Sequence, residues 1–145
     1  MSVVNRSAVA PYTPAQMYFL VQDVPSYPQF LPWCRSATIS PVGPDEVRAT
    51  IELAFHGVHR AFTTANRMQK DKMIEIRLVE GPFRRLKGFW RFDALGDKGC
   101  KISLDMEYEF SNKLLVLAVG PVFSQIANSL VDAFYRRATQ VYGKG

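Results

Sequence analysis

Hydrophobic and polar residues alternate strictly between Lys101 and Phe110. A period of two predicts a β-strand with one buried face and one solvated face. The expected buried face consists of Ile102, Leu104, Met106, Tyr108 and Phe110. The segment from Arg85 to Phe92 follows nearly the same pattern, and its expected buried positions are Leu86, Gly88, Trp90 and Phe92. Together these segments predict strands of a half-buried antiparallel sheet that curves at Gly88.

Turn-forming residues divide the chain between Ser36 and Phe110 into further strand-like segments. The turn signals are Pro44-Asp45, His56-Gly57, Lys70-Asp71, Gly81-Pro82 and Gly96-Asp97. Connections this short favour a meander in which each strand pairs with the next. Val3–Ala10 alternates loosely and adds a first strand. We therefore expect a curved antiparallel sheet of roughly six to seven strands.

Two segments have the helical period instead. Thr13 is a favourable N-cap and Pro14 suits the first helical position, so a short helix is expected to begin there. Asn112–Tyr142 predicts a long amphipathic C-terminal helix, in which Gly120-Pro121 should produce a kink or begin the regular part. Its expected apolar stripe is Val119, Val122, Phe123, Ile126, Leu130, Phe134, Ala138 and Val141.

The expected sheet has more apolar surface than these helices can cover. A helix is about 10–12 Å wide and strands lie about 4.8 Å apart, so one long helix covers only part of such a sheet. The segment Ser26–Cys34, SYPQFLPWC, is unusually apolar for a connecting loop and is placed to act as a plug or lid. We expect one α+β domain over residues 1–145, with a plugged core or a cavity beneath the C-terminal helix.

Composition and charge restrict the class of protein. Apolar residues make up 48% of the 145 residues and charged residues 21%, which is typical of a globular protein. The net charge of +5 would attract nucleic acid, ribosomes or anionic lipid alike. The first residues, MSVVNRSAV, have neither the apolar run of a signal peptide nor the amphipathic pattern of a transit peptide. We expect a cytoplasmic protein, with peripheral contact to the inner membrane as a further expectation.

Catalytic chemistry is not expected from the residues. If Gly57-Val58 forms the hairpin turn, His56 and His59 face each other at an exposed tip, but no third metal ligand lies close in sequence. The chain has no phosphate-binding, dinucleotide-binding or hydrolase motif. Cys34 has no neighbouring base and follows the apolar plug, so we interpret it as a small buried hydrophobic residue. We expect no enzyme activity, no metal site and no required cofactor.

Basic residues cluster in the segment FRRLKGFWR. A solvated sheet face is the simplest interpretation, and contact with ribosomal RNA or anionic lipid headgroups is the alternative. The chain lacks the paired stacking aromatics of an RNA-binding motif, so sequence-specific recognition of nucleic acid is not expected. The expected contact residues are Arg84, Arg85, Lys87 and Arg91, joined by Arg136 and Arg137 of the helix.

Four segments resemble the coenzyme Q-binding START-like family of the polyketide cyclase/dehydrase-like superfamily. They are PYTPAQMYFLVQDVPSYPQFLPWC, FTTANRM, EGPFRRLKGFWRF and FSNKLLVLAVGPVFSQIANSLVDAFYRRATQVYG. The resemblance implies the helix-grip fold, in which the sheet wraps around the C-terminal helix. It implies a cavity that holds ubiquinone or a similar isoprenoid lipid in support of respiratory electron transport. The family also contains bacterial ribosome-association toxins, which bind the large ribosomal subunit and block subunit association, and this role is the alternative.

The ligand contacts that this resemblance implies lie on the plug, the inward strand positions and the helix stripe. The plug, Tyr27–Trp33, would control access, and Trp90 would form part of the floor. Thr64 and Asn66 are either core polar groups satisfied by backbone or water, or partners, with Tyr108, of a quinone carbonyl. The other expected contacts are Phe30, Trp33, Phe62, Leu86, Trp90, Phe92, Leu104, Met106, Phe123, Ile126 and Leu130. Without the resemblance, the same residues are ordinary core packing.

Overall fold

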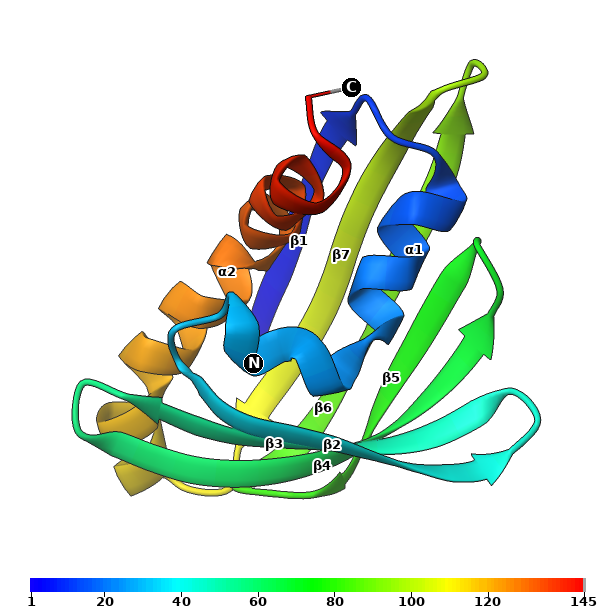
Figure 1. The fold of residues 1–145 in the computed structure, drawn as a ribbon. Helices are drawn as coiled ribbons and strands as arrows, with labels where there is room; N and C mark the ends of the chain where they lie inside the picture. The colour runs from blue at the N-terminus through cyan, green and yellow to red at the C-terminus, as the bar shows by residue number, and fades with distance from the viewer. Residues whose placement is uncertain (145) are drawn as a thin grey trace.

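Seven antiparallel strands form one sheet in the computed structural model, which describes residues 1–144 (Figure 1). The order is β1-β7-β6-β5-β4-β3-β2, so consecutive strands pair from β2 to β7 and β1 joins the far side of β7. This confirms the predicted meander and its number of strands. The strands are β1 Ser2–Ala10, β2 Cys34–Gly43, β3 Glu46–Phe55, β4 Val58–Gln69, β5 Met73–Glu80, β6 Phe83–Leu95 and β7 Gly99–Phe110.

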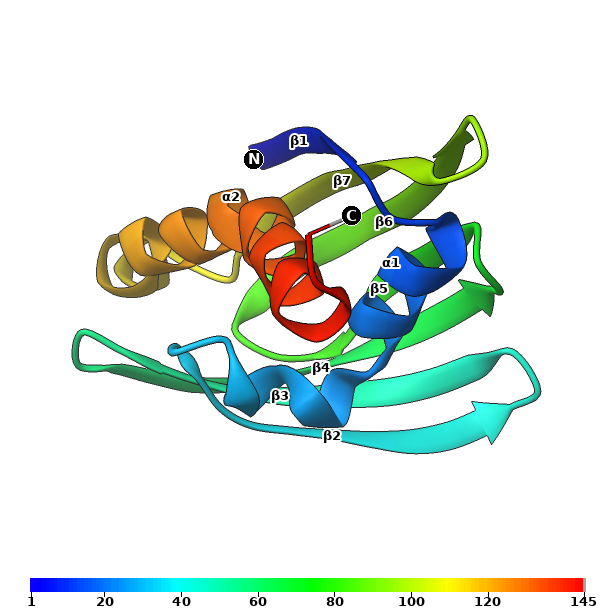
Figure 2. The same cartoon turned by 45° about the horizontal axis from the view of Figure 1, so that its top comes forward.

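The sheet is strongly curved, and the helices lie on its concave face (Figures 1 and 2). Glycine is required at one point of close approach between β6 and β7. A Cβ atom at Gly88 would lie 2.8 Å from the carbonyl oxygen of Asp105, closer than real Cβ contacts. The alternation predicted for these two strands is confirmed, because Leu86, Trp90, Leu104 and Met106 are all buried.

The short helix α1, Pro14–Gln22, begins as the sequence predicts. The Thr13 hydroxyl accepts a hydrogen bond from the Gln16 backbone N–H at 3.1 Å, and the Thr13 N–H donates to the Gln16 side-chain oxygen at 2.9 Å. This capping box satisfies two donors that a helix start leaves free. The chain continues into a 3₁₀ helix, η1, Val24–Gln29, which contains the first part of the predicted plug.

The long helix α2, Lys113–Tyr142, crosses the concave face. It begins at the Asn112 cap and continues through Pro121. Of the two alternatives predicted for Gly120-Pro121, a start of the regular part there is therefore wrong. Val141 is exposed, contrary to the predicted stripe, because the last turn packs through Tyr142, whose hydroxyl donates to the Gln16 carbonyl at 2.9 Å. By length and composition α2 could cross a membrane, although core helices of globular proteins share these properties.

The β3–β4 turn lies at the predicted turn signal, His56-Gly57, and not at Gly57-Val58, the turn assumed for the facing histidines. His56 and Gly57 form it, with φ values of 48° and 79°, and Phe55 pairs with Val58. Positive φ at both central residues is typical of the type I′ hairpin turn, whose twist matches that of the strands. His59 therefore pairs with Ala54 and not with His56, so the predicted facing histidines are wrong.

Candidate ligand-binding cavity

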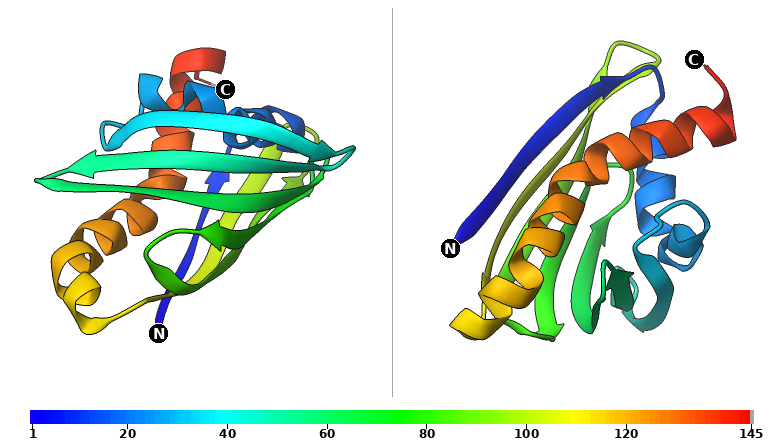
Figure 3. Two further views of the ribbon diagram at one scale, coloured as in Figure 1. Left: turned by 90° about the horizontal axis from the view of Figure 1, so that it is seen from below. Right: turned by 90° about the vertical axis from the view of Figure 1, so that its left-hand side faces the viewer.

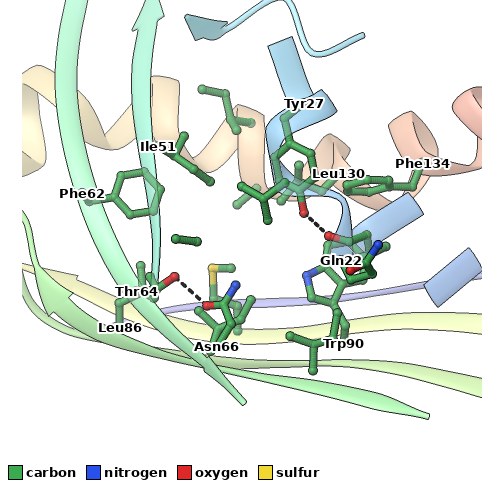
Figure 4. Close-up of a pocket in the computed structure, with 18 of the residues that line it drawn as sticks. Gln22, Tyr27, Ile51, Phe62, Thr64, Asn66, Leu86, Trp90, Leu130 and Phe134 are labelled. Carbon is green, nitrogen blue, oxygen red and sulfur yellow. Dashed lines mark hydrogen bonds between the residues drawn. The ribbon is translucent and has the colours of Figure 1, made fainter. Parts of the chain in front are cut away.

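An apolar cavity of about 80 Å³ lies between the concave face of the sheet and α2 (Figure 4). Inward side chains of β3 to β7 form one wall, and the apolar side of α2 forms the other. The ends of α1 and η1 close the remaining side. The curvature of the sheet produces this space, because the single long helix does not fill the concave face.

Ten of the fourteen predicted ligand contacts line this cavity. The helix contributes three of them and the plug one, while β4, β6 and β7 contribute the rest. These ten are Trp33, Phe62, Thr64, Asn66, Leu86, Trp90, Met106, Phe123, Ile126 and Leu130. Their role in ligand binding remains a prediction, but all ten line the wall of the same cavity.

The other four predicted contacts lie elsewhere in the core. Leu104 is fully buried between layers, and the ring of Phe92 packs edge-on against Tyr18 at 5.7 Å. Tyr108 belongs to an aromatic cluster, with its ring centroid 4.7 Å from that of Phe123, and it does not line the cavity. Phe30 packs on the outer side of Phe134 at 5.4 Å.

Several lining residues were not predicted from the sequence. Gln22 and Tyr27 come from the segment that closes the cavity, and Phe134 comes from the helix stripe. The apolar plug and the helical period were signals for Tyr27 and Phe134. Gln22 had no such signal, because a polar residue at a helix end is ordinarily solvated. The other unpredicted lining residues include Ile51, Leu53, Met68, Ile74 and Ile76.

The predicted plug closes the cavity with aromatic side chains. Tyr27 and Trp33 are both buried and line the cavity, and the Tyr27 ring packs edge-on against Phe134 at 5.4 Å. The Tyr27 hydroxyl donates a hydrogen bond to the Val21 carbonyl oxygen. Burial raises the pKa of this hydroxyl above its ordinary value, so Tyr27 is a neutral donor that joins η1 to α1.

Thr64 and Asn66 are the two buried polar residues of the described chain. The Thr64 hydroxyl donates to the Asn66 side-chain oxygen at 2.7 Å, which leaves the Asn66 amide nitrogen with its two N–H groups (Figure 4). Among residues 1–144 no hydrogen bond is found from this amide nitrogen or from the indole N–H of Trp90. In the described chain, every side-chain nitrogen or oxygen that is fully inaccessible has a hydrogen-bond partner. These two donors have no partner there, so each keeps some accessible surface. Both therefore border open space on the cavity wall.

Among the described lining residues there is no Asp, Glu, His, Lys or Cys. Both cysteines lie outside the lining, and burial raises the pKa of the Cys34 thiol to about 11. A thiol with this pKa is protonated near neutral pH and is a poor nucleophile. The cavity thus offers apolar surface and hydrogen-bond donors, which suit a largely apolar ligand with an acceptor atom.

An open groove adjoins the cavity between α1 and the β2–β3 and β4–β5 turns. Gln22 and Met68 line both the groove and the cavity, so these two side chains separate them. Both are long, unbranched and only partly buried.

The predicted basic cluster is divided in the structure. Arg85, Lys87 and Arg91 are exposed on the convex face of β6. Acidic residues of β7 lie opposite the first two, and the Lys87 ammonium is 3.1 Å from Glu107. Arg84 is displaced by a β-bulge and donates to the Ser111 carbonyl at 3.5 Å.

The two helix residues predicted to join this cluster do not do so. Arg137 lies on the concave side, 4.9 Å above the Phe30 ring, and donates to the Gln29 side-chain oxygen at 3.0 Å. Arg136 precedes it on α2 and is exposed. A metal centre is not indicated either, since no group of three or more His, Cys, Asp or Glu residues gathers within the described chain.

Comparison with known proteins identifies a family and several relatives to which this chain is similar. Residues 10–135 match the family model described as "Polyketide cyclase / dehydrase and lipid transport". The chain is 42% identical over 142 residues to the ribosome association toxin RatA of Escherichia coli strain K12, covering 98% of this chain and 90% of that protein. It is 26% identical over 145 residues to the mitochondrial coenzyme Q-binding protein COQ10 homolog B of Xenopus laevis, covering 97% of this chain and 59% of that protein.

The fold is also found in a solved structure. A START superfamily protein from Mycobacterium smegmatis superposes with a TM-score of 0.79 at 19% identity, over 96% of this chain and 98% of that one. This confirms the predicted START-like fold, a curved antiparallel sheet around a long C-terminal helix.

Proposed function

Because the chain belongs to the polyketide cyclase/dehydrase and lipid transport family, we propose that it binds an isoprenoid quinone, ubiquinone, without converting it. In this proposal the bound quinone supports respiratory electron transport. The observation that carries the proposal is the pair of free N–H donors, on Asn66 and Trp90, in an otherwise apolar cavity. A quinone carbonyl is an acceptor on an apolar ring and matches this surface. The name of the Xenopus laevis relative supports the same ligand.

Binding would require the cavity to expand. An engineered apolar cavity of about 150 Å³ holds benzene, and ligand pockets usually have about 300–1,000 Å³. The 80 Å³ present here is smaller, so in the proposal the walls of the cavity move apart to admit the ligand. The ring would lie near Asn66 and Trp90, and the isoprenoid tail would leave between Gln22 and Met68 into the adjoining groove.

The proposal includes no chemical step. General acid–base catalysis needs a titratable group within hydrogen-bond reach of the reacting atom. The hydroxyl of Tyr27 is the titratable group of the described lining, and it is held by the Val21 carbonyl with a raised pKa. The arrangement supports sequestration of a ligand rather than its turnover.

Protein purified from ubiquinone-producing cells is expected to carry a quinone at near-stoichiometric occupancy. Native mass spectrometry of the complex, followed by organic extraction and chromatography, measures both occupancy and identity. A protein that is purified empty and also fails to bind added short-chain ubiquinone would contradict the proposal. A matched preparation from cells unable to make ubiquinone distinguishes quinone binding from uptake of any lipid.

A second candidate function is binding to the large ribosomal subunit, favoured by the 42% identity to a ribosome association toxin. The convex surface of β6 would make the contact, through Arg85, Lys87 and Arg91. Changing all three to Gln should weaken co-sedimentation with large subunits by about tenfold or more, since each loses a phosphate contact. The control is Arg35→Gln/Arg60→Gln on β2 and β4. Equal binding of both variants would exclude this surface, and intact quinone binding would separate the two functions.

A further inference from the structure

The first turns of α2 expose large apolar side chains. Leu114 and Leu117 are 76% and 77% exposed, and Val116 is 48% exposed. Leu114 and Leu117 are three residues apart, so they lie on one side of the helix and form a continuous ridge. Single exposed leucines are ordinary, whereas here two of them lie next to each other at a helix end. Figure 3 shows this end of α2 at the edge of the molecule.

Basic side chains border this ridge. An open groove of about 760 Å³ brings Arg84 and Lys113 together with Leu117, at the ends of β6 and β7. One acidic residue, Glu109, also lines the groove. The only acidic residue of α2 is Asp132, far along the helix, so the exposed end carries positive charge and no negative charge of its own. No ion pair of Arg84 or Lys113 is found among residues 1–144.

We propose that this α2 tip, defined as Lys113–Leu117 together with Arg84, docks on an anionic lipid bilayer. Leucine side chains at the tip would enter the boundary between headgroups and acyl chains, while Lys113 and Arg84 contact lipid phosphates. The proposal rests on the exposed surface alone and goes beyond the proposed ligand. It adds a location for the proposed binding, because docking brings the protein to the bilayer, in which isoprenoid lipids dissolve.

Other partners fit this surface less well. Structured RNA rewards positive charge and stacking aromatics, but it offers no place for two aliphatic side chains. A second copy of the chain would bury the leucines, but a two-fold contact at this end would bring Arg84 and Lys113 close to their own copies. A bilayer accommodates both features of the tip, because its surface is anionic and its interior is apolar.

Sedimentation of the full chain with phosphatidylcholine vesicles, with and without phosphatidylglycerol, tests the proposal. The expected result is binding to the anionic vesicles that Leu114→Ser/Leu117→Ser weakens at least tenfold. The matched control is Leu95→Ser/Val141→Ser, at sites of 45% and 47% exposure away from the tip, and it should bind as the unchanged protein does. Circular dichroism checks that both variants fold.

A second variant and a second readout complete the test. Arg84→Gln/Lys113→Gln should weaken binding to anionic vesicles and leave the weaker binding to neutral vesicles unchanged. Absence of binding by the unchanged protein, or equal binding by the leucine variant and its control, overturns the proposal. A change of oligomeric state with unchanged vesicle binding would show a self-contact instead. Because short-chain quinone binding is measured without vesicles, failure of the docking proposal is distinguishable from failure of the ligand proposal.

Discussion

Replacement of Trp90 by alanine is expected to lower the free energy of unfolding by about 3–5 kcal/mol. The Trp90 side chain is 4% exposed and packs edge-on against Phe134, with ring centroids 5.3 Å apart. Removing the indole would lose its buried apolar surface and would enlarge the cavity that it already lines. Urea unfolding at constant temperature measures the change, and the denaturant slope checks that unfolding remains two-state.

The neighbouring aromatic residue provides the control for this prediction. Phe89 lies on the convex face of β6, next to Trp90 in sequence, with the Arg91 guanidinium 5.6 Å above its ring. Phe89→Ala should lower the free energy of unfolding by about 1 kcal/mol, which is the size of a cation–π contact at a half-exposed site. Similar losses for the two variants would contradict the assignment of Trp90 to the core wall of the cavity.

The same variant connects stability to ligand binding. Trp90→Ala removes both an aromatic wall and one of the two free donors, so it should gain affinity for small apolar molecules while losing affinity for quinones. Engineered apolar cavities bind small hydrocarbons in this way. Opposite changes in affinity for small apolar molecules and for quinones are specific to a ligand cavity. Loss of ordinary core packing would not change the two affinities in opposite directions.

Much of the fold could be predicted from the sequence because the relevant signals are local. Strict alternation in Lys101–Phe110 and a continuous helical stripe after Asn112 each report on which side of one element is buried. Turn residues then determine which strands are neighbours. The turn signal His56-Gly57 is confirmed, with both residues at positive φ, and only the Gly57-Val58 turn assumed for the histidines is wrong. A second error lies where tertiary packing decides, because Tyr142 replaced Val141 as the packed residue.

The cavity could be predicted only in part. Parity along β4 and β6 placed Thr64, Asn66 and Trp90 on one inward face, and all three line the cavity. Its small volume could not be predicted, because it depends on how closely α2 and η1 approach the sheet. Gln22 was missed for the same reason, since only the position of α1 over β6 and β7 brings it to the cavity. The division of the basic cluster required the β-bulge at Arg84, which alternation does not reveal.

The double variant Thr64→Val/Asn66→Leu is expected to lower affinity for a short-chain ubiquinone by about ten- to a hundredfold. The new side chains have nearly the shape of the old ones, so the cavity stays apolar and closed. A quinone carbonyl buried there would lose its amide donor, and an unpaired buried polar atom costs about 1–3 kcal/mol, where about 1.4 kcal/mol is tenfold. The protein itself should remain folded, since removing both partners of a hydrogen bond together is nearly neutral.

The structure offers a matched control on the opposite face of the same strands. The hydroxyls of Thr50 and Thr63 form a hydrogen bond of 2.8 Å on the convex face of β3 and β4, so Thr50→Val/Thr63→Val removes a similar polar pair away from the cavity. Quenching of tryptophan fluorescence measures affinity directly, because both tryptophans, Trp33 and Trp90, line the cavity. Equal affinities for the two double variants would show that the Thr64–Asn66 pair is only a core hydrogen bond. A selective loss at the inward pair, with an isoprenoid hydrocarbon still bound, would show that the cavity recognises an acceptor oxygen.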